Sequence, residues 1–433
     1  MKIQIYFLFI FLLISTKNFS QKHIVLNDST SGSSLTTNQT YLPFLFSPGL
    51  NVRTGEETIT SIHRGITYFE DNLIGTKWFS ESNILGKTGG ISGRLAKYAF
   101  LDAPLDYFSV VFAHEFFGHG SRYREFDIDG IHYGFDLPPP YGHGGGQATK
   151  NGALPLSYHE LLSFCSGGVE VQSGINRTLS LRWISRNEMS YREASQYYWS
   201  FQIFMNYIQN TDENLLNSSS RNDINVYTRT LNAQAVYTDP GKIKMSVKDL
   251  KTKMMINIVN PFLVYSLYSI IKTYFWEGNQ TNKVPMLSFG DVKYLPGLRA
   301  GFTPFGVEYH LDNYFRFKDI TSLIDLRYGD RTFYNGWGGV GILIQNIYNS
   351  QNFSFDANLN IWKQPGLKFG NDNAELKGKG LGGAFSIRGY YDFQNTELPL
   401  SAVLELGYKS VGFIEGYYLD SSPIIAFGFA LRY

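Results

Sequence analysis

The last third of the chain alternates between apolar and polar residues with a period of two. In its final segment Ile425, Phe427 and Phe429 share one face of an extended strand, and Ala426 and Gly428 share the other. Such alternation is typical of β-strands that face two different environments. Segments of this kind begin near residues 295, 307, 321, 338, 353, 382, 400 and 423. The pattern predicts an antiparallel sheet of about eight strands over residues 290–433.

Upstream of this region the apolar residues follow a helical spacing. An apolar segment without Gly or Pro runs from Asp106 to the histidine at position 114, and a second helix is expected from Ser157 to Glu170. Capping patterns at Ser190 and Ser246 predict two further helix starts. We therefore expect a mostly helical domain over residues 96–285, preceded by a lead-in with short strands over residues 21–95.

The first residues have the pattern of a secretory signal peptide. Lys2 supplies the positive start, an apolar run extends from Ile3 to Ile14, and Ser20 is a suitable small residue before a cleavage point. Residues 1–20 are therefore expected to be removed, and the mature protein is expected to leave the cytoplasm.

Composition narrows the class of protein. The 38 Lys and Arg residues balance the 37 Asp and Glu residues, so no basic excess points to nucleic acid as a partner. The 34 Phe, 30 Tyr and 43 Gly residues are a combination typical of β-barrels. The chain has one cysteine, Cys165, which excludes an intrachain disulfide. We interpret Cys165 as a small buried residue.

The alternating region resembles the small eight-stranded outer-membrane barrels of Gram-negative bacteria. One face of its strands is aliphatic and aromatic, and the connections alternate between short and long, except for the short one near Pro304. The resemblance implies a transmembrane β-barrel whose narrow lumen is filled by ion pairs among the residues of the opposite face. These charged residues are Glu308, Asp312, Asp325, Arg327, Arg388, Glu405 and Arg432. Outer-membrane lipid is then a partner, and the upstream helical domain is expected in the periplasm.

The stretch Met254–Ile271 contains no charged residue and is long enough to raise a transmembrane interpretation. Asn257, Asn260 and Pro261 favour a buried pair of helices instead, because polar groups are unfavourable in lipid.

One short motif carries candidate chemistry. In His114-Glu115-Phe116-Phe117-Gly118-His119, two imidazoles can bind a metal ion and a carboxylate lies beside the first of them. The common zinc-peptidase spacing is i and i+4. Here the spacing is i+5, which places the side chains about 140° apart on an ideal helix. We therefore predict a π-bulge at residues 116–118, where Gly118 tolerates the distortion.

The motif resembles the H-E-x-x-G-H motif of dipeptidyl peptidase III, a family of zinc exopeptidases. The resemblance covers six residues and implies that His114 and His119 bind Zn²⁺ and that Glu115 is the general base. It also implies a glutamate about fifty residues downstream as third ligand, a position that Glu170 matches. Gly167 and Gly168 would let the backbone of that segment approach the motif helix. His143, His159 and Glu160 remain alternative ligands or substrate contacts.

The sequence thus predicts an α+β multidomain protein, in which a helical zinc-peptidase-like domain precedes a transmembrane β-barrel. We expect a zinc metallopeptidase anchored in the outer membrane, acting on a peptide or protein substrate. An alternative is a barrel protein whose metal domain only binds or scaffolds during envelope assembly. A third hypothesis is an intramembrane protease of the site-2 type built on the Met254–Ile271 span.

Overall fold

The structure of the chain is a computed structural model that describes residues 40–73, 84–137, 145–152, 155–217, 222–238, 244–370, 375–393 and 399–432. The predicted signal peptide, residues 1–20, lies outside the described residues, and so does His143.

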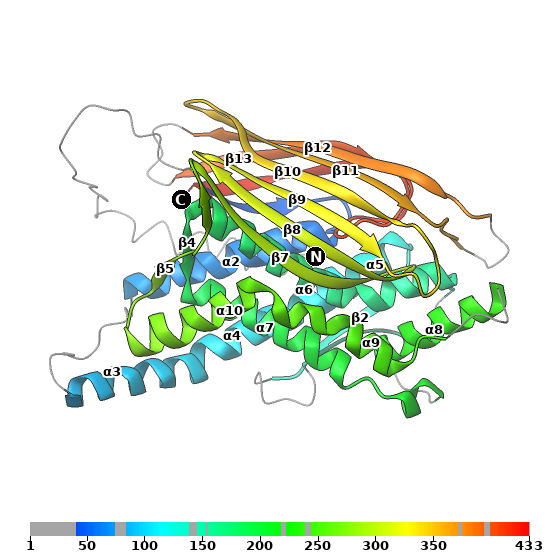
Figure 1. Ribbon diagram of the computed structural model, residues 1–433, viewed down its shortest axis with the longest axis horizontal. Helices are drawn as coiled ribbons and strands as arrows, with labels where there is room; N and C mark the ends of the chain where they lie inside the picture. Colours follow the sequence, from blue (N-terminus) through cyan, green and yellow to red (C-terminus); the bar gives the residue numbers. More distant parts are fainter. Residues whose placement is uncertain are drawn as a thin grey trace.

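A ten-stranded antiparallel sheet lies over a bundle of helices, so the chain is a mixed α+β protein (Figure 1). The strand order is β1-β14-β13-β12-β11-β10-β9-β8-β7-β6. The strands of this sheet are β1 (Tyr41–Phe46), β6 (Leu287–Phe289), β7 (Val292–Thr303), β8 (Gly306–Phe317), β9 (Ile320–Gly329), β10 (Gly338–Asn349), β11 (Phe353–Gln364), β12 (Gly380–Asp392), β13 (Leu400–Lys409) and β14 (Ser422–Arg432). Two smaller ribbons pair β2 (Ile131–Phe135) with β3 (Gly146–Lys150) and β4 (Glu188–Ser190) with β5 (Thr281–Lys283).

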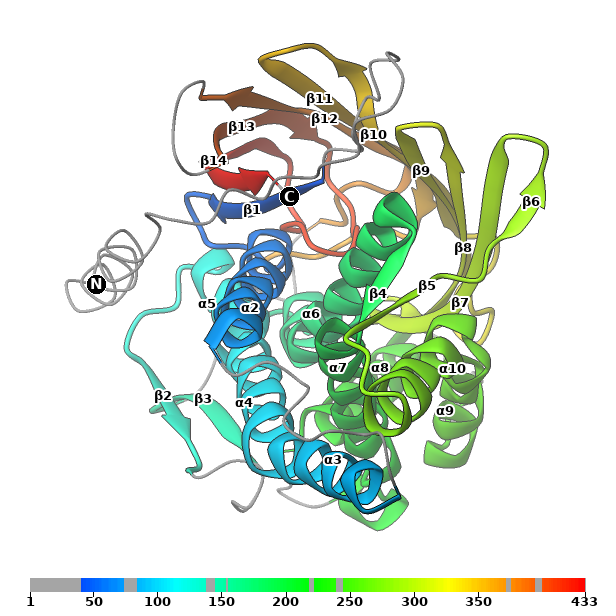
Figure 2. The ribbon, with the colours of Figure 1, turned by 90° about the vertical axis from the view of Figure 1, so that its left-hand side faces the viewer.

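The helices precede the long strands in the sequence. They are α2 (Val52–Leu73), α3 (Ile84–Lys97), η1 (Tyr98–Asp102), α4 (Ala103–Phe112), η2 (Ala113–His119), α5 (Gly120–Glu125), α6 (Tyr158–Arg186), α7 (Tyr191–Gln209), η3 (Glu213–Asn217), α8 (Asp223–Thr238), α9 (Val247–Met254), η4 (Met255–Val259), α10 (Pro261–Tyr268) and η5 (Ser269–Trp276). The predicted starts at Ser190 and Ser246 are confirmed, since each serine caps its helix. The long helix α6 lies under the arch of the sheet (Figure 2).

The eight predicted strands are present as β7 to β14, but the expected closed barrel is not what they form. The sheet gains β1 and β6 and remains open, because β1 and β6 are its two edges and do not pair with each other. The alternation of residues specified the two faces of each strand. It carried no information on what lies beside the outermost strands.

Helices close both edges of the sheet through side-chain hydrogen bonds. At one edge, Thr58 of α2 accepts from the Leu45 N–H at 3.0 Å and donates to the Leu45 carbonyl at 3.2 Å. At the other edge, Asn257 of η4 donates to the Ala300 carbonyl at 3.2 Å and accepts from the Ala300 N–H at 3.0 Å. Figure 2 shows α2 beside β1 and α10 beside β7. Helices therefore take the place that further strands hold in a closed barrel.

A proline precedes the bonded residue both in β1 and in the part of β7 that extends beyond its short pairing with β6. Pro43 lies two residues before Leu45, and Pro296 lies four residues before Ala300. Side chains and N–H directions repeat every two residues along a strand, so both prolines stand where an unpaired N–H would otherwise point out of the sheet. The edges thus expose few free donors.

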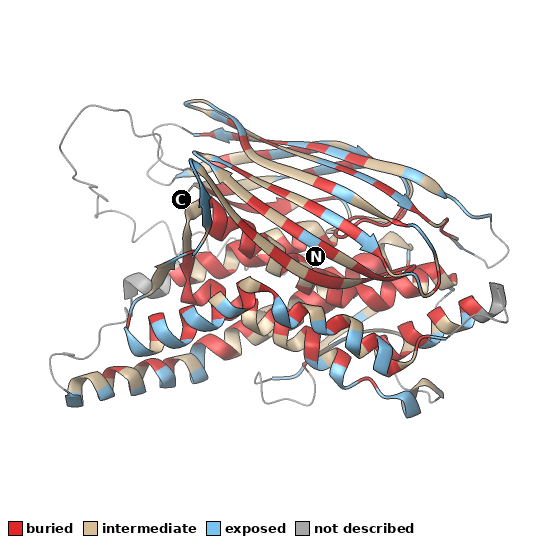
Figure 3. Cartoon of the chain, viewed as in Figure 1, coloured by how far each residue is buried: buried red, intermediate tan, exposed pale blue. Residues whose placement is uncertain are grey.

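The two faces of the sheet are inverted relative to a water-soluble protein. On β13, Leu404 and Leu406 are about half exposed, whereas Glu405 is 1% and Lys409 0% exposed. Figure 3 shows the same alternation as bands across the neighbouring strands. The predicted inner ion pairs are present: Arg388 lies 2.8 Å from Glu405, and the other charges of this face form similar contacts.

Within the described part of the chain, no single helix combines the length and the apolar composition needed to cross a membrane. The bent pair Val247–Val259 and Pro261–Trp276, with 57° between its halves, passes that test only as a unit. Its predicted burial holds for one face: Phe262 is 1% exposed, but Val259 and Ile271 are 62% and 58% exposed. The pair is therefore amphipathic, with its buried side toward the sheet edge.

Candidate metal centre

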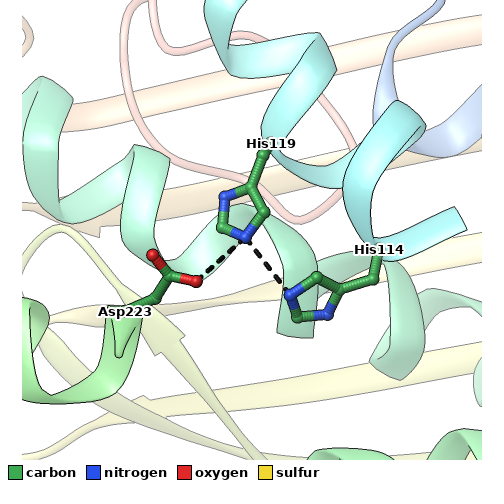
Figure 4. Close-up of side chains that lie close together, drawn as sticks. All are labelled: His114, His119 and Asp223. Atoms are coloured by element: carbon green, nitrogen blue, oxygen red, sulfur yellow. Dashed lines mark hydrogen bonds and ion pairs between the residues drawn. The ribbon is translucent and has the colours of Figure 1, made fainter. Parts of the chain in front are cut away.

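The motif histidines lie in a π-helical segment, as their spacing predicts. Residues 113–119 form η2, and the Gly120 N–H bonds to the carbonyl of Glu115, five residues earlier. A π-turn brings residues i and i+5 onto one side of the helix. The Nε2 atoms of His114 and His119 consequently face each other at 3.2 Å (Figure 4).

Glycines allow the motif to pack directly against α6. A Cβ atom added to Gly118 would lie 2.6 Å from the Cα of Gly168, and one added to Gly168 would lie 2.2 Å from His114 Nε2. Both contacts are too short for any side chain. The expected close approach of Gly167 and Gly168 to the motif helix is confirmed, and it is what fixes the position of the His114 ring.

The third residue at the centre is Asp223, the first residue of α8. Its Oδ2 atom lies 3.1 Å from His119 Nε2 (Figure 4). The Tyr207 hydroxyl donates to the same oxygen at 2.8 Å. His119 Nδ1 lies 3.0 Å from the Phe164 carbonyl, to which it donates, so that Nε2 is the nitrogen left for a ligand. The carboxylate and the His119 imidazole are thus held by neighbours that orient them.

The spacing of these atoms fits a small cation. Two Nε2 atoms and one carboxylate oxygen lie within 4.8 Å of one another. Ligands about 2.0–2.1 Å from a tetrahedral zinc ion are about 3.3–3.4 Å apart. The two separations of 3.2 and 3.1 Å agree with that value. The donor set of two imidazoles and a carboxylate is also one that divalent zinc accepts.

Glu170, which the sequence favoured as third ligand, does not join the group. Its carboxylate accepts from Arg122 at 2.6 Å and from the Gly416 N–H at 2.7 Å. Two residues along a helix correspond to about 200° of rotation, so Glu170 points away from the side on which Gly168 meets His114. Burial raises the pKa of Glu170, and Arg122 opposes that shift. Its role in the structure is to pair with this arginine.

Of the alternative ligands, His159 and Glu160 are also engaged elsewhere. His159 Nδ1 accepts from the Lys368 N–H at 2.9 Å. Glu160 closes the capping box of α6 and accepts from the Gly370 N–H at 3.1 Å. Both residues join the start of α6 to the connection between β11 and β12.

Glu115 lies beside the three-residue group and is 6% exposed. The Ala148 N–H of β3 bonds to its carboxylate. Gly146 permits this approach, because a Cβ there would lie 2.7 Å from Glu115 Cγ. Burial raises the pKa of Glu115 to about 7, with His119 and Asp223 acting in opposite directions. A carboxylate with this pKa is suited to accept a proton near neutral pH.

The charges at the centre are strongly coupled. Burial and the neighbouring His119 lower the pKa of His114 to about 3. Burial alone would lower the pKa of His119 as well, but the Asp223 carboxylate raises it to about 9. In the metal-free centre at neutral pH, His119 is therefore protonated and His114 is neutral. A divalent cation would displace that proton, which is the usual linkage between metal binding and pH.

A second group of metal-ligating residues, His310, Asp312 and Asp325, lies on the inner face of β8 and β9. Arg299 already occupies it: its Nε is 2.7 Å from Asp312, and its guanidinium is 3.7 Å from Asp325. A cation in this position would meet a fixed positive charge. We therefore interpret it as part of the buried ion-pair network.

Sequence reasoning missed Asp223. It lies more than one hundred residues after His119, and its neighbours form no motif with the histidines. Its one local signal is an acidic residue in the first turn of a helix, which is common in any helix.

Comparisons of the chain with protein-family models, with curated proteins and with solved structures found no significant match.

Proposed function

We propose that this chain is a zinc-dependent hydrolase of the metallopeptidase type, with His114, His119 and Asp223 as metal ligands and Glu115 as general base. The observation that carries the proposal is the convergence of two Nε2 atoms and one carboxylate oxygen, with a second carboxylate of raised pKa next to them. Three protein ligands leave a fourth position for water, as in catalytic zinc sites.

Each residue of the metal centre has a separate role in amide hydrolysis. The bound metal would supply an acidified water and a Lewis acid for the substrate carbonyl. Glu115 takes the proton of the attacking water and later returns it to the leaving amine. Tyr207 holds Asp223 through the 2.8 Å hydrogen bond, and the Phe164 carbonyl holds His119. These outer contacts keep the ligands in place during the reaction.

We also propose that the protein resides in the outer membrane of a Gram-negative cell. Exposed apolar residues occupy the outward face from β8 to β14, including Leu326, Phe385 and Phe427. Strands of 10 to 13 residues suffice to cross the hydrocarbon core when tilted. A contiguous exposed apolar face of this kind marks an interaction surface, and lipid is the occupant that we propose.

Contact with lipid accounts both for the apolar outer face of the sheet and for the hydrogen bonds at its two edges. The apolar surface continues past the sealed β7 edge onto α10 and η5, where Val264, Leu267 and Ile271 are exposed. Backbone groups exposed to lipid need internal partners, and Thr58 and Asn257 provide them at the two edges. The membrane wall proposed here is thus a sheet completed by helices rather than a closed barrel.

The test of the hydrolase is made on the full chain purified in detergent. Zinc content by mass spectrometry should be one ion per chain for the wild type and near zero for His114→Ala. Wild-type protein should cleave members of a mixed peptide library, read by mass spectrometry, and lose this activity after chelation. Purified wild-type protein without bound zinc would overturn the proposal.

The scaffold alternative differs in one result. The site is rather closed, since His114, Glu115 and His119 are each less than 10% exposed. If the protein holds one zinc ion, cleaves nothing and loses stability on chelation, the metal serves the fold and the scaffold is favoured.

A further inference from the structure

The direction of the strands defines two rims of the sheet. The strands β7, β9, β11 and β13 end at one rim, which we call the long-loop rim; its connections are residues 304–305, 330–337, 365–379 and 410–421. The opposite rim, the short-turn rim, carries the connections 318–319, 350–352 and 393–399. Since Tyr41 pairs with Arg432, β1 starts at the short-turn rim and ends at the long-loop rim.

The helix that follows the metal motif is bonded to the long-loop rim. Arg122 donates to the Tyr417 carbonyl at 3.1 Å, in the connection between β13 and β14. Arg124 donates to the carbonyls of Gly49 and Leu50, just after β1. Both arginines lie within five residues of His119, so the motif itself is close to this rim.

The other helices of the centre show the same placement. Tyr227, one turn after Asp223, donates to the Thr303 carbonyl at the end of β7, at 2.7 Å. Gln234, further along α8, donates to the Tyr334 hydroxyl in the connection between β9 and β10. The ligand Asp223 is thus fixed to the long-loop rim through its own helix.

Helix α6 spans the distance between the two rims. Ser157, at its start, donates to the Lys368 carbonyl at the long-loop rim, at 2.9 Å. Ser185, near its end, lies 3.4 Å from Thr40 at the short-turn rim. A helix of 29 residues, about 43 Å long, therefore runs from rim to rim. Gly168, which contacts His114, lies nearer the long-loop end.

We propose that the metal centre faces the outside of the cell and acts on a protein or peptide there, an inference that rests on the proposed function and membrane placement. Outer-membrane proteins carry short turns on the periplasmic side and longer loops on the extracellular side. The centre lies on the side of the longer loops. This reverses the sequence-based expectation of a periplasmic zinc domain, which rested on an eight-stranded barrel with both ends on the periplasmic side and the helices upstream of it.

The packing of the helices explains the reversal. Helix α6 lines the inner face of the sheet and is buried along nearly its whole length, and η2, α2, α7 and α8 pack against it. Position in the sequence therefore does not set the side of the membrane. Contacts with the strand connections set it.

The test is cysteine labelling in intact Gram-negative cells that express the full chain. Cys165 is buried and is the one cysteine of the sequence, so Cys165→Ala provides the background. Asp420→Cys places a thiol at the long-loop rim, Gln351→Cys places one at the short-turn rim, and both positions are exposed. Asp212→Cys, in the exposed segment after α7, marks the end of the helix that carries Tyr207.

A membrane-impermeant maleimide should label positions 420 and 212 in intact cells, and position 351 only after the outer membrane is permeabilised. Labelling of position 351 in intact cells, with loss of labelling at 420, would overturn the proposal. So would recovery of the unlabelled chain in the soluble periplasmic fraction. The His114→Ala variant is labelled in parallel: an unchanged pattern without zinc separates the orientation from the metal chemistry.

Discussion

Asp223 Oδ2 lies 3.1 Å from His119 Nε2, although the two residues belong to helices far apart in the sequence. This contact, and not the one expected from Glu170, completes the candidate metal centre. The same carboxylate oxygen also accepts from Tyr207, which holds the side chain through a second contact.

Asp223→Asn should weaken zinc binding, whereas Glu170→Gln should not. An amide oxygen is a poor replacement for a carboxylate ligand, and even the loss of an outer contact lowers metal affinity by about 10–100-fold. Glu170 contacts Arg122 and not the histidines, so its change affects stability instead. A competition titration with a chromogenic chelator measures both variants. Equal loss in Glu170→Gln would contradict the assignment of the third ligand.

Gly168→Ala should disrupt the centre because its Cβ would lie 2.2 Å from His114 Nε2. We expect a loss of zinc and a destabilisation of about 1–3 kcal/mol, the usual range for overpacking. Gly65→Ala is the matched control, since a Cβ there meets nothing within 4 Å. On α2 this change should be neutral or stabilising by up to about 1 kcal/mol. Zinc content and the thermal midpoint in detergent, compared for both variants, decide the matter; a zinc-replete Gly168→Ala protein would refute the packing argument.

Two adjacent glutamates should respond to pH in opposite ways. Burial raises the pKa of Glu56 from 4.5 to about 7, so its stabilising contribution is present below pH 4.5 and is lost as pH rises through 7. The corresponding free energy is ~3 kcal/mol at most. Glu56→Gln removes the loss and should be more stable than the wild type at pH 8.

Glu57 is partly buried, but Arg388 and Arg182 outweigh the desolvation and lower its pKa. Its contribution is present above the unfolded pKa and is lost as pH falls through the folded pKa. Glu57→Gln should therefore be less stable than the wild type at neutral pH. Thermal unfolding of both variants between pH 4 and pH 8 measures the two signs, and the same sign for both would show that the arginines do not control these carboxylates.

Asn257→Leu should open one edge of the sheet. The change leaves the Ala300 N–H and carbonyl without their partner, and each buried unsatisfied group costs about 1–3 kcal/mol. Asn349→Leu, at an exposed strand end, is the control and should have little effect. Amide hydrogen exchange at Ala300 should rise in the first variant alone. Unchanged protection would mean that the Asn257 amide does not seal β7.

The effect of Leu404→Arg on stability distinguishes a lipid-facing surface from a water-facing one. In a bilayer, a charged residue near the middle of a strand destabilises a membrane sheet by about 2–4 kcal/mol. On a water-exposed surface, replacing an exposed leucine by arginine is close to neutral. Asp420→Arg, in the connection after β13, is the matched control. Urea unfolding in lipid vesicles should show the loss at position 404 only; two neutral variants would refute lipid contact.

The sequence predicted those features that depend on local spacing. The i+5 separation of His114 and His119 implied a π-helix, and the Gly167–Gly168 pair implied close helix packing; both are present. Alternation also located the eight long strands. The edge contact at Asn257 and the candidate ligand Asp223 could not be predicted, because each depends on a long-range contact that no local pattern encodes.

Glu170 illustrates the limit of spacing alone. The spacing between His119 and Glu170 along the chain suited a third ligand. However, the close contact between Gly168 and His114 determines which face of α6 points toward the metal centre. Once that contact is fixed, helical geometry turns Glu170 toward Arg122.

The most direct test of the central claim is the Glu115→Gln variant, with zinc content and peptide cleavage measured on the same purified sample. The amide keeps the shape of the side chain but cannot accept the proton of the attacking water. We expect one zinc ion per chain, as in the wild type, together with a fall in kcat of about 100- to 10,000-fold. A zinc-bound Glu115→Gln protein that cleaves peptides at the wild-type rate would contradict the assignment of Glu115 as general base.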